Sequence, residues 1–246
     1  MRTTSHGRYT TQLTRFPQAF PVNAYLVKED DGYTLIDATI PGSANAILAA
    51  ARAQGGAIKR IILTHAHIDH TGSLDKLHAA LPDVPVMVSA RDARFLSGDK
   101  SLDPSEQLPG AKARGSFQKV ATVPTRLLKD GDTVGSLLVV ASPGHTPGHV
   151  AFFDQRDATL IAGDAFQTRG GVAVSGTIKP LFPFPALATW HAPTALESAR
   201  RLQGLSPSRL AVGHGVVVEQ PADAIASAIV EAEKHVLKLQ ADSTRP

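Results

Sequence analysis

Three histidines and an aspartate are crowded into the segment THAHIDH at residues 64–70. The chain holds only ten histidines in 246 residues, so this short segment carries far more than its share. Buried imidazoles and carboxylates are costly without partners, and the crowding therefore favours a bound ligand. His65 and His67 are two residues apart and point the same way in an extended segment, whereas His70 follows the turn into a helix and can face a second point.

Further candidate ligands follow three other apolar segments. His145 comes after LLVVASPG, Asp164 after ATLIAG, and His214 after RLAVG. Each apolar segment is short enough to be a buried strand. Because ligand sites of α/β sheets lie beyond the carboxyl ends of the strands, we expect these side chains to meet at one edge.

These five histidines and two aspartates exceed the three protein ligands of a mononuclear catalytic zinc site, but suffice for two cations. Two cations about 3.5–4 Å apart activate a hydroxide at neutral pH, which indicates metal-assisted hydrolysis. We expect zinc, although such ligands suit manganese, iron, cobalt and nickel too. One metal site would take His65, His67 and His145, and the other would take Asp69, His70 and His214. Asp164 would bridge the two sites. Asp69 and Asp164 would be the catalytic carboxylates.

The elements that must position these residues follow from alternation, helical periodicity and turn residues. Strands are predicted near 10–16, 23–29, 32–38, 59–65, 84–90, 125–131, 136–144 and 150–164, and at 209–215. Helices are predicted over 44–54 with Ser43 as the cap, over 73–81, from 91, over 186–202, and over 221–239.

Strands alternate with helices, and hairpins are added in each half of the chain. This pattern favours an α/β fold with two mixed β-sheets flanked by outer helices over a single doubly wound sheet. We expect one domain over residues 1–246, with irregular loops at about 98–123 and 167–185 over the site.

Composition excludes several classes of protein. The absence of cysteine rules out disulfides, thiol nucleophiles and iron–sulfur clusters. The net charge is +3, and charges of both signs alternate in RDARFLSGDKSLDPSE (91–106), which predicts a solvated surface rather than a nucleic-acid site. With no signal-type or membrane-spanning segment, we expect a cytoplasmic enzyme. Its partner is expected to be a small-molecule substrate, and neither a nucleic acid nor a membrane. A homodimer that forms through the apolar stripe of the last helix is an option.

The motifs together resemble the metallo-β-lactamase-fold hydrolases. THAHIDH matches the HxHxDH signature, and LIDA with Asp37, SPGHTPGH, AGD (162–164) and GHG (213–215) match the other four motifs over residues 23–215. The resemblance implies an αββα metallo-β-lactamase sandwich with the ligand roles given above. It also implies that Asp37 orients a ligand histidine, and we expect His149 to brace its turn rather than to bind metal. We expect His191 to start a helix.

Within this family the substrate class stays open between several branches. The family's β-lactamases commonly lack a bridging aspartate or use a cysteine ligand, whereas this chain has Asp164 and no cysteine. Glyoxalase II enzymes, which are thioesterases, carry an additional C-terminal helical region, and only about thirty residues follow His214. Ribonuclease Z relatives need a basic exosite, and none is visible in this sequence. These points favour the lactonase and esterase branch, including N-acyl homoserine lactonases.

Three residues are candidates for the substrate pocket. Phe182 and Phe184 in PLFPFP either pack under a loop or form an apolar wall that receives an acyl chain. Gln167 stands where related lactonases often carry a tyrosine, and its amide can donate to a carbonyl oxygen. A mononuclear iron enzyme resembling the persulfide dioxygenases, which use two histidines and an aspartate, is an alternative that metal content would distinguish.

Overall fold

Alternation along the central strands decides which layer each side chain enters. In the computed structural model, which describes residues 1–243, Leu35 and Ile61 pack toward one set of helices. Their neighbours Ile36 and Ile62 face the other way, into a core between two sheets. Successive strand residues point to opposite faces, so a strand with both faces apolar is buried on both sides.

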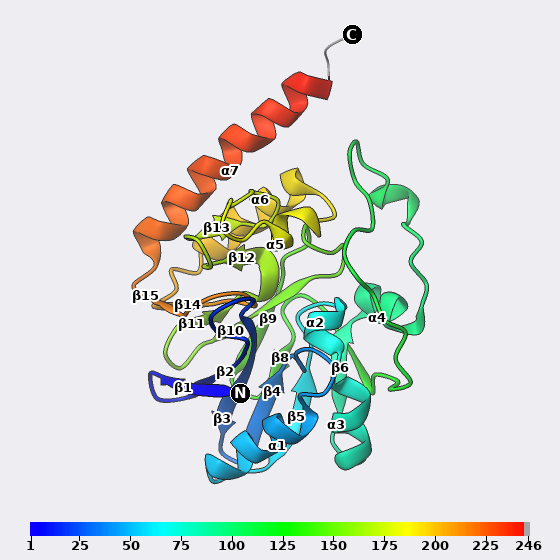
Figure 1. Cartoon of the computed structure of the whole chain (residues 1–246), viewed down its shortest axis with the longest axis vertical. Coiled ribbons are helices and arrows are strands. Elements are labelled where there is room, and N and C mark those ends of the chain that lie inside the picture. The colour runs from blue at the N-terminus through cyan, green and yellow to red at the C-terminus, as the bar shows by residue number, and fades with distance from the viewer. Residues whose placement is uncertain (244–246) are drawn as a thin grey trace.

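The first sheet has seven strands in chain order (Figure 1). Its first four strands are an antiparallel meander, and the remaining three are added in parallel. Asp30 and Asp31 form a tight hairpin turn, because Glu29 pairs directly with Gly32. The strands are β1 (Arg2–His6), β2 (Thr10–Arg15), β3 (Val22–Glu29), β4 (Gly32–Ile36), β5 (Ile58–Ile62), β6 (Val86–Ser89) and β7 (Arg126–Leu128).

The second sheet has six strands in the order β15-β14-β11-β10-β9-β8, and a two-stranded sheet, β12 with β13, lies apart from it. The β11–β14 pair is parallel and the others are antiparallel. The strands are β8 (Thr133–Val134), β9 (Leu137–Ala141), β10 (Val150–Asp154), β11 (Thr159–Ile161), β12 (Phe166–Gln167), β13 (Ala173–Val174), β14 (Arg209–Ala211) and β15 (Val218–Glu219).

Helices cover the outer face of each sheet (Figure 1). Helices α1, α3 and α4 pack on the first sheet, and α6 and α7 pack on the second. The predicted αββα arrangement of two mixed sheets between helices is therefore confirmed. The helices are α1 (Ala44–Ala53), α2 (Ile68–Thr71), α3 (Leu74–Ala80), α4 (Ala90–Ser97), α5 (Phe184–Leu187), α6 (Ala192–Gln203) and α7 (Ala222–Ser243), with 3₁₀ turns at Pro104–Glu106 and Gly163–Ala165.

The single helix predicted over 186–202 is wrong. Helix α5 ends at Leu187, and α6 starts after His191, whose extended backbone places it at the N-cap, as expected. The backbone N–H groups of Trp190 and His191 donate instead to the carbonyls of His145 and Gly144, so this break holds the His145 loop. Pro193 lies in the first turn of α6, where a proline is tolerated, and not in a helix interior.

Two smaller predictions also need correction. Ser43 stands at the N-cap of α1, but its side chain makes no capping hydrogen bond. The last helix begins at Ala222 and continues to Ser243, four residues further than predicted. No helix within residues 1–243 is both long and apolar enough to cross a membrane.

Candidate metal centre

Four strands of the two sheets end beside one another at the same edge. The segment after β5 carries His65, His67 and His70, and the loop after β9 carries His145. The turns after β11 and β14 carry Asp164 and His214. Among the described residues, three overlapping groups of these side chains have potential ligand atoms within 4.8 Å of one another. The sheet edge therefore brings all seven predicted ligands together.

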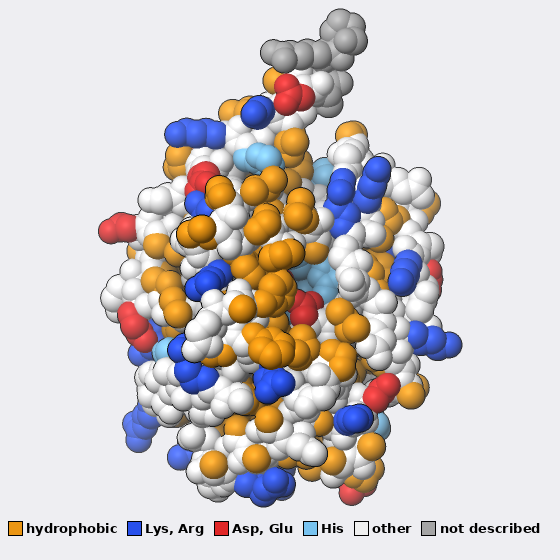
Figure 2. Space-filling model, in the orientation of Figure 1, with side chains coloured by type: hydrophobic (Ala, Val, Ile, Leu, Met, Phe, Trp, Pro, Cys, Tyr) orange, Lys and Arg blue, Asp and Glu red, His pale blue; other side chains and the backbone are white. Residues whose placement is uncertain are grey.

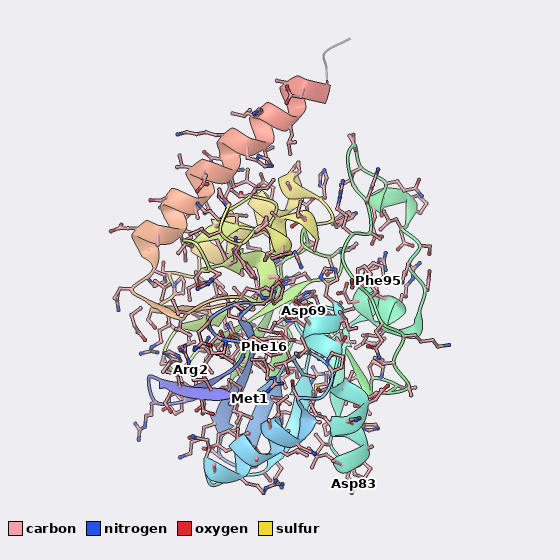
Figure 3. All side chains as sticks on the ribbon, viewed as in Figure 1. Met1, Arg2, Phe16, Asp69, Asp83 and Phe95 are labelled. Carbon is pink, nitrogen blue, oxygen red and sulfur yellow. The ribbon has the colours of Figure 1, made fainter. Side chains whose placement is uncertain are left out.

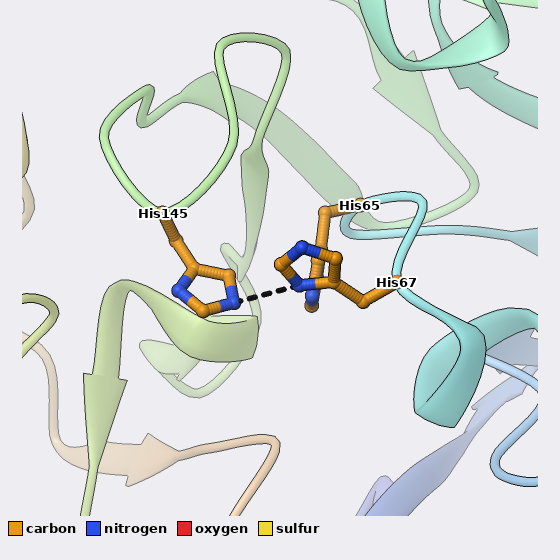
Figure 4. Close-up of side chains that lie close together, drawn as sticks. All are labelled: His65, His67 and His145. Carbon is orange, nitrogen blue, oxygen red and sulfur yellow. Dashed lines mark hydrogen bonds between the residues drawn. The ribbon is translucent and has the colours of Figure 1, made fainter. Parts of the chain in front are cut away.

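The first donor group consists of three buried histidines, His65, His67 and His145 (Figure 4). Nδ1 of His67 lies 2.9 Å from Nε2 of His145, and Nε2 of His67 lies 2.9 Å from the carbonyl oxygen of Arg114. If His67 donates to that carbonyl from Nε2, its Nδ1 lone pair faces His145. The convergence of ring nitrogens on one point is the arrangement that a cation needs.

The second donor group consists of Asp69, His70 and His214. Nε2 of His214 lies 3.3 Å from Oδ2 of Asp69. The two histidines are buried, but 23% of the Asp69 side chain is exposed to solvent. Figure 3 labels Asp69 near the middle of the front face, where Figure 2 shows a hollow with acidic and histidine side chains at its base. The second group is therefore the side of the centre that a substrate can reach.

Asp164 lies between the two groups. Its Oδ2 is 3.3 Å from Nε2 of His145 in the first group and 3.1 Å from Nε2 of His214 in the second. Its Oδ1 is 3.4 Å from Nε2 of His70. Gly213 makes room for this carboxylate, because a Cβ there would lie 2.0 Å from Oδ1. The structure thus places Asp164 where a bridging ligand would stand.

The polar atoms that lack hydrogen bonds test whether this donor set fits metal ions. Nε2 of His65 is buried without a hydrogen-bond partner within residues 1–243, which is costly. Nε2 of His70 and Oδ1 of Asp164 are buried too, and their 3.4 Å contact is an ion pair without a hydrogen bond. The 3.1–3.4 Å contacts of Asp164 match the spacing of about 3.3 Å between ligand atoms that are each about 2.0–2.1 Å from a tetrahedral ion. The residues therefore fit two metal ions.

The two groups differ in their protonation. Burial lowers the pKa values of His65, His67 and His145, so these rings are neutral, which is the form that binds metal. Burial also opposes charge on His214, but Asp164 and Asp69 overcome it and raise the pKa of His214 to about 10. Burial opposes charge on His70 as well, and here Asp164 and Asp37 raise the pKa well above its ordinary value.

Asp37 and His149 lie behind the ligands. Asp37 Oδ2 is 2.7 Å from Nδ1 of His70, and the same carboxylate accepts hydrogen bonds from the backbone N–H and the hydroxyl of Thr64. Nε2 of His149 accepts a hydrogen bond from the backbone N–H of Asp164 at 3.1 Å. Asp37 thus contacts a candidate ligand histidine, and Nδ1 of His149 lies 2.8 Å from the hydroxyl of Ser142 at the start of its own turn.

Several orienting groups gave no recognisable signal in the sequence. The hydroxyl of Ser175 lies 2.9 Å from Nδ1 of His145, and the carbonyl of Pro21 lies 2.7 Å from Nδ1 of His214. The carbonyl of Arg114 performs the same function for His67. A backbone carbonyl belongs to every residue, so only the fold shows which one meets a histidine.

Asp92 corrects the expectation that residues 91–106 form a solvated surface. Its side chain is fully buried, and its carboxylate accepts hydrogen bonds from Ala66 N–H, Thr146 Oγ1 and Gly148 N–H at 2.8–2.9 Å. Burial raises the pKa of Asp92 to about 6, although these donors oppose the shift. The carboxylate thus ties the His65–His67 turn to the loop that carries His145.

The predicted substrate residues lie on the His214 side of the centre. Phe182 is buried with its ring centroid 5.4 Å from that of His214, and half-exposed Phe184 packs against it. Gln167 is buried three residues after Asp164, where its amide nitrogen donates to the carbonyl of Phe182 at 3.2 Å. Its amide oxygen has no partner in the described structure. Their predicted role in the pocket stays a prediction.

Comparison with known proteins supplies the family. The model of the metallo-beta-lactamase superfamily matches residues 17–214. YobT of Bacillus subtilis is 51% identical over 224 residues, which are 91% of this chain and 95% of that protein. A hydroxyacylglutathione hydrolase of Bdellovibrio bacteriovorus is 28% identical over 78% of this chain and 62% of that protein.

Solved structures agree with this assignment. TTHA1623 in a di-iron-bound form is 30% identical, with a TM-score of 0.64 over 87% of this chain and 96% of that one. The BLEG-1 B3 metallo-beta-lactamase is 24% identical, with a TM-score of 0.66 over 89% of this chain and 99% of that one. This similarity shows only that the two proteins share a fold. The chain belongs to the metallo-beta-lactamase superfamily. A further relative, YflN of Bacillus subtilis, is 32% identical and named a probable metallo-hydrolase.

Proposed function

We propose that the protein is a dinuclear metal-dependent hydrolase that cleaves the carbonyl–oxygen bond of a lactone or ester, as N-acyl homoserine lactonases do. The observation that carries the reaction class is the convergence of two complete donor groups on one bridging carboxylate. We propose zinc as the native ion, because histidine nitrogen and carboxylate oxygen are among the ligands that it takes.

Two divalent ions at the centre would supply an activated water nucleophile and polarise the scissile carbonyl. The residues of the chain orient and position the reactants. Asp69 is partly exposed, and His214 and His70 hold its pKa below the ordinary value against the effect of burial, so its carboxylate stays ionised and can accept a hydrogen bond from the attacking water. Asp164 is ionised for the same reason and is held by the backbone contact to His149.

The lactone or ester preference rests on the surroundings of the centre. Phe20, Phe182 and Phe184 form an aromatic cluster beside His214, with ring centroids 4.9–5.4 Å apart. An apolar wall next to the ligands favours a substrate with an acyl portion. The partnered amide of Gln167 keeps its second N–H for another acceptor, so donation to a substrate carbonyl is compatible with its position.

A thioesterase is the second candidate function. It is favoured by the similarity to hydroxyacylglutathione hydrolases, whose name states a glutathione thioester substrate. The same donor groups would serve either reaction, because the attacked atom is a carbonyl carbon in both.

The experiment is a pH-stat assay of the zinc-loaded protein with a long-chain N-acyl homoserine lactone, an acyl glutathione thioester and a β-lactam as parallel substrates. We expect chelator-sensitive acid release that is fastest with the lactone. Faster turnover of the thioester would replace the lactonase by the second candidate. In protein prepared with iron instead of zinc, one equivalent of bound iron with oxygen uptake on a persulfide would identify a dioxygenase.

A further inference from the structure

Two residues of the SPGHTPGH motif that are not candidate ligands contact a carboxylate from another part of the chain. The hydroxyl of Thr146 donates to Oδ2 of Asp92 at 2.8 Å, and the backbone N–H of Gly148 donates to Oδ1 at 2.9 Å. The backbone N–H of Ala66, in the middle of the THAHIDH segment, donates to Oδ2 at 2.8 Å. One side chain of α4 therefore joins the two segments that carry the first donor group.

The contacts of Asp92 lie in the protein interior. Asp92 and Ala66 have no exposed surface, and Thr146 is 1% exposed, so losing the common acceptor would leave buried donors unpaired, which is costly. Gly148 allows the close approach, because a Cβ there would collide with Oδ1 and the backbone nitrogen of Asp92. The position of Asp92 is fixed in turn, since its backbone N–H donates to the hydroxyl of Ser89 at the N-cap of α4.

The second donor group is supported by other partners. Asp37 lies 2.7 Å from Nδ1 of His70, and the carbonyl of Pro21 lies 2.7 Å from Nδ1 of His214. Within residues 1–243, the side-chain hydrogen bonds of Asp92 go only to the two segments of the first group. Loss of this carboxylate should therefore affect one group and leave the other unchanged.

We propose that Asp92 is a positioning residue of the first metal site. Its carboxylate holds the His65–His67 turn against the His145 loop, so that the three rings, which come from two separate segments, converge before an ion binds (Figure 4). Asp92 acts through the backbone and not by contact with an ion. A site that is assembled in advance binds more tightly, because binding does not have to order it. The inference rests on the metal centre of the proposed function and on no particular substrate.

The test measures metal affinity at each donor group separately. Asp69→Ala leaves the first group complete and His67→Ala leaves the second, so each provides one site for zinc in competition with a chromophoric chelator. Asp92→Asn keeps one acceptor oxygen but turns an NH₂ group toward a donor. Added to Asp69→Ala, it should weaken zinc binding about 10- to 100-fold, the range typical of a lost orienting partner. Added to His67→Ala, it should change the affinity less than about twofold.

A spectroscopic measurement separates positioning from stability. Cobalt bound in the Asp69→Ala background reports ligand geometry through its visible absorption, which Asp92→Asn should alter. Asp154→Asn is the matched control, because Asp154 is also fully buried and accepts from the backbone N–H of Arg156 at 3.0 Å, at the opposite end of β10 from the His145 loop. It should lower thermal stability without changing the zinc affinity or the cobalt spectrum.

Thr146→Val is a milder variant that does not depend on how well Asp92→Asn folds, because it removes one donor and keeps the carboxylate. It should weaken zinc binding several-fold in the Asp69→Ala background and not in the His67→Ala background. Equal weakening at both groups, or an unchanged affinity and cobalt spectrum at the first group, would overturn the proposal.

These results are separable from the hydrolase assay. A loss of zinc affinity confined to the first group, in a protein that hydrolyses no acyl substrate, would refute the proposed function and support the role of Asp92. Rapid lactone hydrolysis, with zinc affinity at the first group unchanged by Asp92→Asn, would do the opposite.

Discussion

The two donor groups of the centre both contact Asp164 but differ in charge and in exposure. His65, His67 and His145 are buried, neutral and oriented by uncharged partners such as Ser175 and the carbonyl of Arg114. In the other group, His70 and His214 are surrounded by the carboxylates of Asp37, Asp69 and Asp164.

This difference indicates a division of labour within one site. A cation at the neutral group keeps its full charge and polarises bound groups strongly, whereas one at the second group is partly neutralised by carboxylates. The second group also contains Asp69, whose side chain is partly exposed, and is therefore open to solvent. The two groups should therefore behave as distinct sites.

The largest effect is expected from His67→Ala, which removes a ligand of the first group. Bound metal should fall from two equivalents to one, and turnover should drop at least about a thousandfold because the activation of water needs the ions. Metal content is measured by elemental analysis and turnover by pH-stat. His78→Ala, on α3 away from the centre, should change neither quantity. Unchanged metal occupancy in His67→Ala would show that the first group is assigned wrongly.

Asp164→Ala should weaken both groups at once, since its carboxylate contacts histidines of each. We expect the second equivalent of metal to bind more than about a hundredfold more weakly, because losing even a partner that only orients a ligand typically costs about 10- to 100-fold. Competition with a chromophoric chelator measures the affinity. Two equivalents retained at full strength would mean that Asp164 does not bridge.

Loss of a charged orienting partner should lower metal affinity more than loss of a neutral one. Asp37→Asn replaces a charged partner of His70 and should lower metal affinity about 10- to 100-fold. Ser175→Ala removes a neutral partner of His145, while the hydroxyl of Thr189 stays 3.4 Å away, so a loss of only a few-fold is expected. Equal losses, compared by the same chelator competition, would remove the proposed distinction between charged and neutral support.

The convergence of the candidate ligands could be predicted from the sequence, because the motif residues come directly after apolar strands. His145, Asp164 and His214 were found by their position after β9, β11 and β14, and the alternation of Ile61 and Ile62 specified a strand buried on both faces. These are short-range signals that a single segment contains.

The supporting residues could not be predicted, because they depend on contacts between distant segments. Asp92 stands in a charged stretch typical of a surface, and only the packing of α4 against the His145 loop buries it. The break at Thr189–His191 interrupts a helical pattern, because the backbone there bonds to Gly144 and His145.

The smallest effect, and the most direct test of the electrostatic difference, is the number of protons released on metal binding. In the metal-free protein at pH 7, His214 and His70 carry protons because their pKa values are raised, while the first-group rings are already neutral. A cation at the second group must displace about two protons, and one at the first group about none. Binding at the second group should therefore weaken as the pH falls from about 10, whereas binding at the first should not change near neutrality.

Calorimetry in two buffers with different ionisation enthalpies counts these protons. His67→Ala isolates the second group and should release about two protons per ion at pH 7, and Asp69→Ala isolates the first and should release fewer. A histidine with a raised pKa in the folded state keeps its proton up to that pH. Metal and proton therefore compete for the ring nitrogen below that pH and not above it. Equal proton counts in the two variants would show that the carboxylates around His70 and His214 do not set the two groups apart.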